Sequence, residues 1–216
     1  MRNLFSFDSK LTNVLTYIGD LFILNVIYLI CCIPIFTIGP AQAGLYTATR
    51  LMLNPEDDNS VIKAFFKGFA NGFGKISLVG TFFLLLDLVL LYTMWMAWDF
   101  ADTGMYIHWA FPAVFLILCL LVHSLLPAFH SQFSCTPIQL FRNCILLLIT
   151  HPLRSLGVAA LTRAPAALFF LKPNLFLDLG ALFITVYFSV ALLFGVCLLQ
   201  KPFKLLIDDI AQEDDV

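Results

Sequence analysis

Residues 21–49 contain no Asp, Glu, Lys or Arg, and Pro34 and the pair Gly39-Pro40 interrupt this uncharged run. An α-helix needs roughly 20 apolar residues to cross the hydrocarbon core of a bilayer. The run is therefore long enough for one tilted membrane span, or for two short ones that fold back at the Pro/Gly break. The choice between one span and two determines the side of the membrane on which the chain begins.

Composition supports a membrane protein. Of the residues, 61% are hydrophobic and 12% are charged, whereas soluble domains carry roughly 25% charged residues. A fold surrounded by water could not hide this much apolar surface. The formal net charge of -2 is too small to attract nucleic acid, so we expect the lipid bilayer as a partner and no nucleic acid.

Four further apolar runs follow the first, at residues 76–98, 105–129, 155–171 and 175–200. Each can form a transmembrane helix, because a helix satisfies its own backbone hydrogen bonds where no water is available. We therefore predict an all-α fold, a polytopic transmembrane helical bundle in a single membrane domain over residues 1–216. It would have five full spans, or six membrane segments with a Pro/Gly-broken N-terminal hairpin.

Lys and Arg accumulate on the cytoplasmic side of short loops, and this rule orients the chain. They are concentrated in residues 50–75, 130–154 and 201–216, whereas the connections 99–104 and 172–174 together hold one Lys. We expect the first three segments inside, with 201–216 as a cytoplasmic tail. A single first span would place the N-terminus outside, whereas a hairpin returns it to the cytoplasm, which we prefer.

The break of the predicted hairpin contains Pro34, Thr37, Gly39 and Pro40. Pro34 lacks an amide hydrogen and disfavours helix before it, and Gly39 tolerates backbone angles that other residues avoid. We predict arms at 17–34 and 38–53. The second arm is only moderately apolar, so a re-entrant half-helix packed against protein is the alternative to a full crossing.

Residues 60–75 are predicted to form a cytoplasmic amphipathic helix. Its aromatic residues Phe65, Phe69 and Phe73 are spaced four apart and share one stripe, while Lys63 and Lys67 lie off that stripe. An apolar stripe beside basic residues is typical of a helix that lies in the membrane interface. We therefore expect the three Phe side chains to face the bilayer surface.

The order of elements in the first half resembles the YesL family of small bacterial integral membrane proteins. An apolar helix with Leu24-Asn25 is followed by Pro34-Ile-Phe-Thr37-Ile-Gly39-Pro40-Ala41, by a small-residue stretch at 43–46, and by Phe65-Phe66-Lys67-Gly68-Phe69. The resemblance covers about residues 5–100. The family is largely uncharacterised, but its members often lie beside genes for sugar ABC transporters. The resemblance thus implies a bacterial cell (inner) membrane protein associated with carbohydrate uptake.

Two charged residues fall near the middle of predicted spans, Asp87 in 76–98 and Arg163 in 155–171. A charge at that depth costs roughly 3 kcal/mol or more, so such residues usually face the bundle and pair. We predict that Asp87 and Arg163 form an ion pair or share a polar cavity. The pair would fix helix register, the more frequent use of buried pairs, or serve transport or gating.

Three further polar residues in apolar runs, Asn25, Gln42 and His123, are candidates for a polar cavity. His123 could relay protons, although a hydrogen-bonded packing histidine is the more frequent case. The six cysteines show no paired spacing, and the histidines are scattered, so we expect no metal site and no cofactor.

No enzyme motif is legible in the sequence. It lacks a Gly-rich phosphate loop, an H-E-x-x-H zinc motif and a paired-carboxylate pattern. We therefore expect a non-catalytic membrane protein that acts as an accessory or interaction partner of a carbohydrate uptake (ABC transporter) system. Its partner would be the permease or a second copy of the chain. The alternative is a small transporter or channel that uses Asp87 and Arg163.

Overall fold

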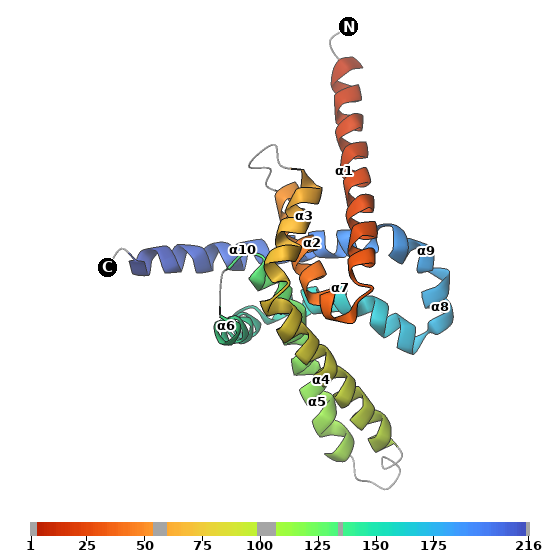
Figure 1. The fold of residues 1–216 in the computed structure, drawn as a ribbon, viewed down its shortest axis with the longest axis vertical. Coiled ribbons are helices and arrows are strands. Elements are labelled where there is room, and N and C mark those ends of the chain that lie inside the picture. The colour runs from red at the N-terminus through yellow and green to blue at the C-terminus, as the bar shows by residue number, and fades with distance from the viewer. Residues whose placement is uncertain (1–3, 54–59, 99–106, 134–135, 215–216) are drawn as a thin grey trace.

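The computed structural model describes residues 4–53, 60–98, 107–133 and 136–214, and every regular element in these ranges is helical (Figure 1). The longer helices are α1 (Leu4–Cys31), α2 (Ile38–Leu53), α3 (Val61–Gly72), α4 (Lys75–Trp98), α5 (Ile107–His130), α6 (Pro137–Thr150), α7 (Pro152–Leu171) and α10 (Phe188–Asp214). Short elements are η1 (Ile35–Thr37), α8 (Pro173–Asp178), α9 (Gly180–Leu182) and the π-helical turn η3 (Phe183–Tyr187).

Four stretches in the described ranges are long and apolar enough to cross a membrane. They are Val14–Cys31, Lys75–Ala97, Ala110–His130 and Gly180–Lys204. A fifth would be added if α6 and α7, which are bent by 113° at His151, count as one broken span. The chain is therefore an all-α, multi-pass helical bundle. Figure 1 shows α1 projecting from one side of its centre and the α4–α5 pair from the opposite side.

The Pro/Gly break between α1 and α2 is held by Thr37. Its hydroxyl oxygen lies 2.6 Å from the carbonyl oxygens of both Cys31 and Pro34, and the first of these belongs to the last residue of α1. The last carbonyls of a helix have no partner within the helix, so Thr37 satisfies a group that the break would leave open. This contact gives the Pro-x-x-Thr spacing a structural reason.

The turn of the hairpin lies against the start of α4. The Ser77 hydroxyl donates to the Phe36 carbonyl at 2.6 Å, and a Cβ on Gly39 would lie 2.9 Å from Ile76 Cγ2. A hairpin whose arms both crossed the membrane would carry its turn to the side opposite the start of α4 in the predicted threading. In that threading the contact favours the re-entrant alternative, and whether the second arm crosses fully stays a prediction.

Helices α2 and α3 form a tightly packed pair. A Cβ on Gly44 would lie 2.7 Å from the Phe65 carbonyl oxygen, and one on Gly68 would lie 2.9 Å from the Cα of Gly44. Small residues allow helix backbones to approach this closely. The helix expected to lie on the bilayer surface therefore packs on α2, with Phe65 fully buried, Phe69 partly buried and Phe73 exposed.

Several predicted boundaries change in the structure. The amphipathic helix ends at Gly72, not at residue 75, because Lys75 begins α4. The predicted span 175–200 is divided among α8, α9, η3 and α10, and α10 continues as a helix through the expected tail to Asp214. The span 155–171 corresponds to α7, which begins at Pro152. The span 105–129 corresponds to α5, and its residues 105 and 106 lie outside the described residues, as do 215 and 216.

Candidate functional site

The charged residues predicted to pair are brought together by three helices. Asp87 lies in the middle of α4, His123 and Ser124 follow one another on α5, and Arg163 lies on α7. Helices α4 and α5 pack along each other (Figure 1), and α7 packs on α5. Asp87 and His123 are each 5% exposed. The bundle therefore encloses a carboxylate that the sequence places within an apolar helix.

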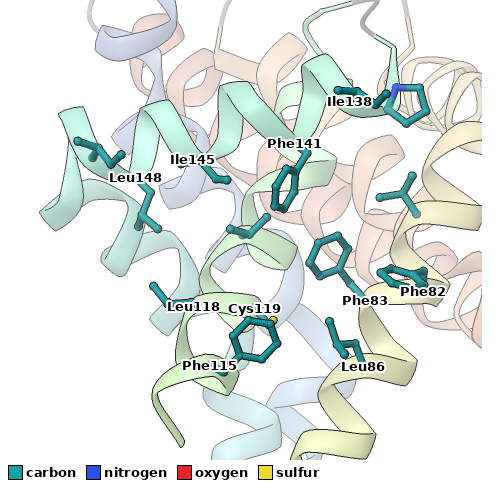
Figure 2. Close-up of a pocket in the computed structure, with 14 residues that line it drawn as sticks. Phe82, Phe83, Leu86, Phe115, Leu118, Cys119, Ile138, Phe141, Ile145 and Leu148 are labelled. Carbon is teal, nitrogen blue, oxygen red and sulfur yellow. The ribbon is translucent and has the colours of Figure 1, made fainter. Parts of the chain in front are cut away.

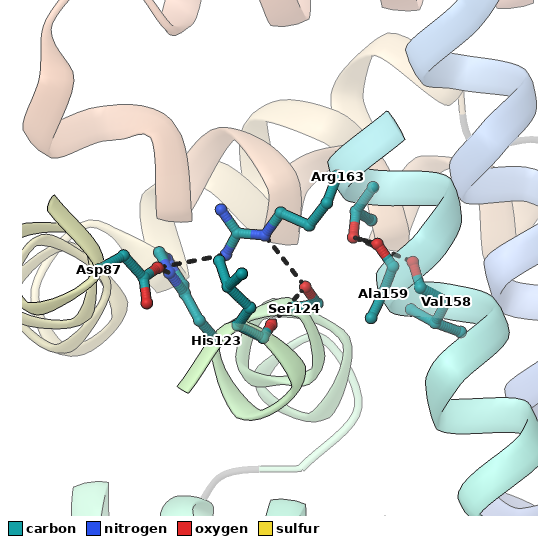
Figure 3. Close-up of polar contacts among 8 residues, drawn as sticks. Asp87, His123, Ser124, Val158, Ala159 and Arg163 are labelled. Carbon is teal, nitrogen blue, oxygen red and sulfur yellow. Dashed lines mark hydrogen bonds and ion pairs between the residues drawn. The ribbon is translucent and has the colours of Figure 1, made fainter. Parts of the chain in front are cut away.

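One carboxylate oxygen of Asp87 contacts both His123 and Arg163 (Figure 3). Asp87 Oδ2 lies 2.8 Å from His123 Nδ1 and 3.8 Å from Arg163 Nη2. The Arg163 Nε–H donates to the Ser124 hydroxyl oxygen at 3.2 Å, and that hydroxyl donates to the Leu120 carbonyl at 2.7 Å. Asp87 and Arg163 are thus within ion-pair distance, as expected, and His123 is a closer partner that the sequence did not reveal.

The centre is electrically balanced when His123 is neutral. The charges of Asp87 and Arg163 then cancel. The imidazole donates its Nδ1–H to Asp87, and we assign this tautomer from the short Nδ1–Oδ2 distance. Buried charges need both a counter-charge and hydrogen bonds to be stable. The second oxygen of the carboxylate, Asp87 Oδ1, is buried and accepts no hydrogen bond from the described residues. The Arg163 side chain is 30% exposed, whereas the Asp87 side chain is 7% exposed.

This arrangement allows limited chemistry. The carboxylate and the imidazole can exchange a proton across their 2.8 Å contact. Asp87 Oδ1 can accept a hydrogen bond from a further donor. No set of three or more metal-ligating side chains lies together within the described ranges.

Arg163 also approaches the N-terminal helices. It lies near Tyr28 of α1, whose hydroxyl neighbours the side chains of Cys32 and Gln42. Gln42, on α2, is partly exposed. Gln42 therefore lies at the edge of the charged centre through Tyr28 and makes no direct contact with Asp87 among the described interactions.

Asn25 forms a second polar centre with η3. Its amide nitrogen donates to the Phe183 and Ile184 carbonyls at 3.0 and 2.6 Å. Its amide oxygen accepts from the Phe188 and Ser189 N–H groups at 2.9 and 3.2 Å. A π-helical turn interrupts the regular helical hydrogen-bond ladder, and Asn25 satisfies groups on both sides of the interruption. The polar cavity predicted for Asn25, Gln42 and His123 is therefore divided among separate partners.

The charged centre and its surroundings can be compared with known proteins. Residues 21–94 match a family described as "Protein of unknown function, DUF624". The matched part runs from the second half of α1 through most of α4, so it includes the Thr37 turn, Asn25 and Asp87 but ends before His123 and Arg163. No curated protein and no solved structure matches the chain.

Proposed function

We propose that this chain is a non-catalytic protein of the bacterial cell membrane and an accessory partner of a carbohydrate-uptake system of the ABC-transporter type. The resemblance of residues 34–41 to the YesL family supports this proposal, and these residues fall within the match to a family of unknown function. The concentration of Lys and Arg in 50–75 and 201–216 supports a cytoplasmic location for these segments and for the C-terminus.

The observation that carries the proposal is the isolation of the first half of the α1 span. Its apolar residues Val14, Leu15, Tyr17, Ile18 and Phe22 are 45–66% exposed. Because residues 14–18 lie on more than one side of the helix and are all exposed, the described part of the chain leaves this end of the span uncovered, where α1 projects from the bundle in Figure 1. Such a helix offers an intramembrane surface to a partner helix, either from a permease or from a second copy of the chain.

Affinity purification in a mild detergent, with identification of the bound proteins, tests the proposal. We expect a sugar ABC permease subunit to be recovered with the unaltered chain. Leu15→Trp with Ile18→Trp should reduce that recovery severalfold, because bulkier side chains alter the surface of α1. Leu78→Trp is the matched control, since Leu78 is 75% exposed on α4. Absence of any permease, or equal recovery with all variants, contradicts the proposal.

A small transporter or channel is the second candidate, and Asp87 Oδ1 favours it. This carboxylate oxygen is buried without a hydrogen-bond donor, which lowers the stability of the fold. Such a group inside a membrane usually marks a functional site, for example one that binds a proton or a solute. Flux of protons or labelled sugars into proteoliposomes of the purified protein tests this function. We expect flux that Asp87→Asn lowers at least tenfold and Thr93→Val, elsewhere on α4, leaves unchanged. Proteoliposomes without flux contradict it.

A further inference from the structure

An apolar groove runs along the outside of α4, α5 and α6 (Figure 2). Its volume is about 720 Å³, and its lining includes Phe82 and Leu86 of α4, Phe115 and Leu118 of α5, and Phe141 and Ile145 of α6. Every lining side chain is apolar. Figure 2 shows α6 crossing one end of the α4–α5 pair, so that its side chains close that end of the groove.

Helices α4 and α5 are both candidate membrane spans, so the walls that they form would face hydrocarbon in a bilayer. Several of its lining residues are widely open to their surroundings; Phe82 is 61% exposed and Phe115 is 45% exposed. A groove of this kind in contact with water would be unstable. In a bilayer, the hydrocarbon tails of lipids meet it directly.

The volume distinguishes between the possible occupants. A spanning helix about 10 Å wide and about 30 Å long displaces roughly 2,400 Å³, more than three times the groove. If each methylene occupies about as much space as a water molecule, roughly 30 Å³, a 16-carbon acyl chain needs about 480 Å³. One acyl chain therefore fits within the groove, and a helix could only lie across its mouth.

Two basic residues each lie about one helical turn from a residue that lines the groove. Lys75 precedes the lining residue Val79 by four positions, and Arg142 follows the lining residue Ile138 by four. Residues four apart on a helix share a face. Both basic side chains are exposed, and neither forms an ion pair within the described ranges. They provide positive charge for a headgroup whose chain enters the groove.

We propose that the groove binds one acyl chain of an anionic phospholipid, with the headgroup phosphate at Lys75 and Arg142. The chain would lie along α4 and α5 and contact Phe83, which also lines the groove. The ring of Phe83 lies 6.0 Å from the His123 ring. Phe83 therefore lies between the lipid site and the charged centre. An acyl chain in the groove would contact the Phe83 ring, which packs beside the His123 ring.

Native mass spectrometry of the full chain tests the site. The protein is reconstituted into vesicles of phosphatidylglycerol and phosphatidylcholine with identical chains, extracted in mild detergent, and the retained lipid is counted. We expect one retained phosphatidylglycerol. Lys75→Gln and Arg142→Gln should each weaken its retention roughly fivefold, the usual effect of one basic residue near an anionic surface. Leu118→Trp should abolish retention, because it fills the groove.

Matched control variants distinguish a specific lipid site from a general effect of the substitutions on the protein. Leu146→Trp, at an exposed position of α6 that does not line the groove, and Lys67→Gln, on α3, should retain the lipid fully. The melting temperature of each variant checks that it is folded, and a folded Val79→Phe provides a second groove-filling variant if Leu118→Trp does not fold. Equal retention of both lipids, or equal loss in groove and control variants, overturns the proposal. Cross-linking of the groove to a protein chain also overturns it.

Discussion

At the scale of single residues, Asp87 is a buried charge among apolar neighbours in sequence. Its charge is balanced by Arg163 at 3.8 Å, and removal of one partner leaves the other buried or half-buried without a counter-charge. We expect Asp87→Asn and Arg163→Gln each to lower the free energy of unfolding by roughly 1–3 kcal/mol, below the loss for a fully buried pair, because Arg163 is partly exposed.

The double variant decides whether the two residues interact. Asp87→Asn with Arg163→Gln should cost less than the sum of the single changes by at least about 1 kcal/mol, measured by denaturant unfolding in mixed micelles. Asp87→Asn with Arg154→Gln, on the same helix as Arg163, is the control and should be additive within about 0.5 kcal/mol. Additivity of the Asp87 and Arg163 changes would show that the ion pair contributes nothing to stability.

Asn25 gives a second prediction at this scale. Asn25→Leu keeps a side chain of similar size but removes the donors and the acceptor that satisfy four backbone groups around η3. We expect a loss of roughly 1–3 kcal/mol in the free energy of unfolding, because buried backbone groups lose their partners. Asn71→Leu, at an exposed position of α3, should change it by less than about 0.5 kcal/mol. An equal loss of stability in both variants would show that the hydrogen bonds of Asn25 to η3 do not stabilise the fold.

At the scale of helices, the α2–α3 pair depends on residues without side chains. Gly68→Ala would bring a methyl group within 2.9 Å of the Cα of Gly44. We expect it to lower the free energy of unfolding by roughly 1–3 kcal/mol, the usual cost of overpacking. Gly19→Ala meets no atom within 4 Å and should raise it by up to about 1 kcal/mol, because Ala favours the helix. Thermal unfolding of both variants measures the two changes in stability, which should have opposite signs. Changes of the same sign would contradict the close packing of α2 on α3.

Helices were predictable from the sequence where hydropathy alone defines them. The runs 76–98 and 155–171 lie close to α4 and α7, because a long and mostly apolar segment has few other ways to satisfy its backbone in a membrane. The last span was not predictable in detail. Its π-helical turn is satisfied by Asn25, whose partner Phe183 lies 158 positions away in sequence, and a hydropathy pattern contains no information about such a contact.

At the scale of the whole molecule, the pairing of elements was the part that sequence could not supply. The stripe of Phe65 and Phe69 shows which face of α3 is apolar, but a bilayer and a neighbouring helix both suit that face. Asp87 and Arg163 could be paired in advance, because both are charges in apolar runs. His123 could not, since a buried histidine has many suitable partners and the packing of α4 on α5 selects one of them.

The contact between the α1–α2 turn and α4 predicts how the N-terminal region is arranged in the membrane. The Phe36 carbonyl accepts from Ser77, two residues after Lys75, so the turn and the start of α4 should be reached from the same side. In a variant whose native cysteines are replaced, Ile35→Cys and Lys75→Cys should react with a membrane-impermeant maleimide from one side only. Asn174→Cys, exposed at the start of α8, should react from the other side. If Ile35→Cys instead reacts together with Asn174→Cys, both hairpin arms cross the membrane, and the packing of the turn on α4 is excluded.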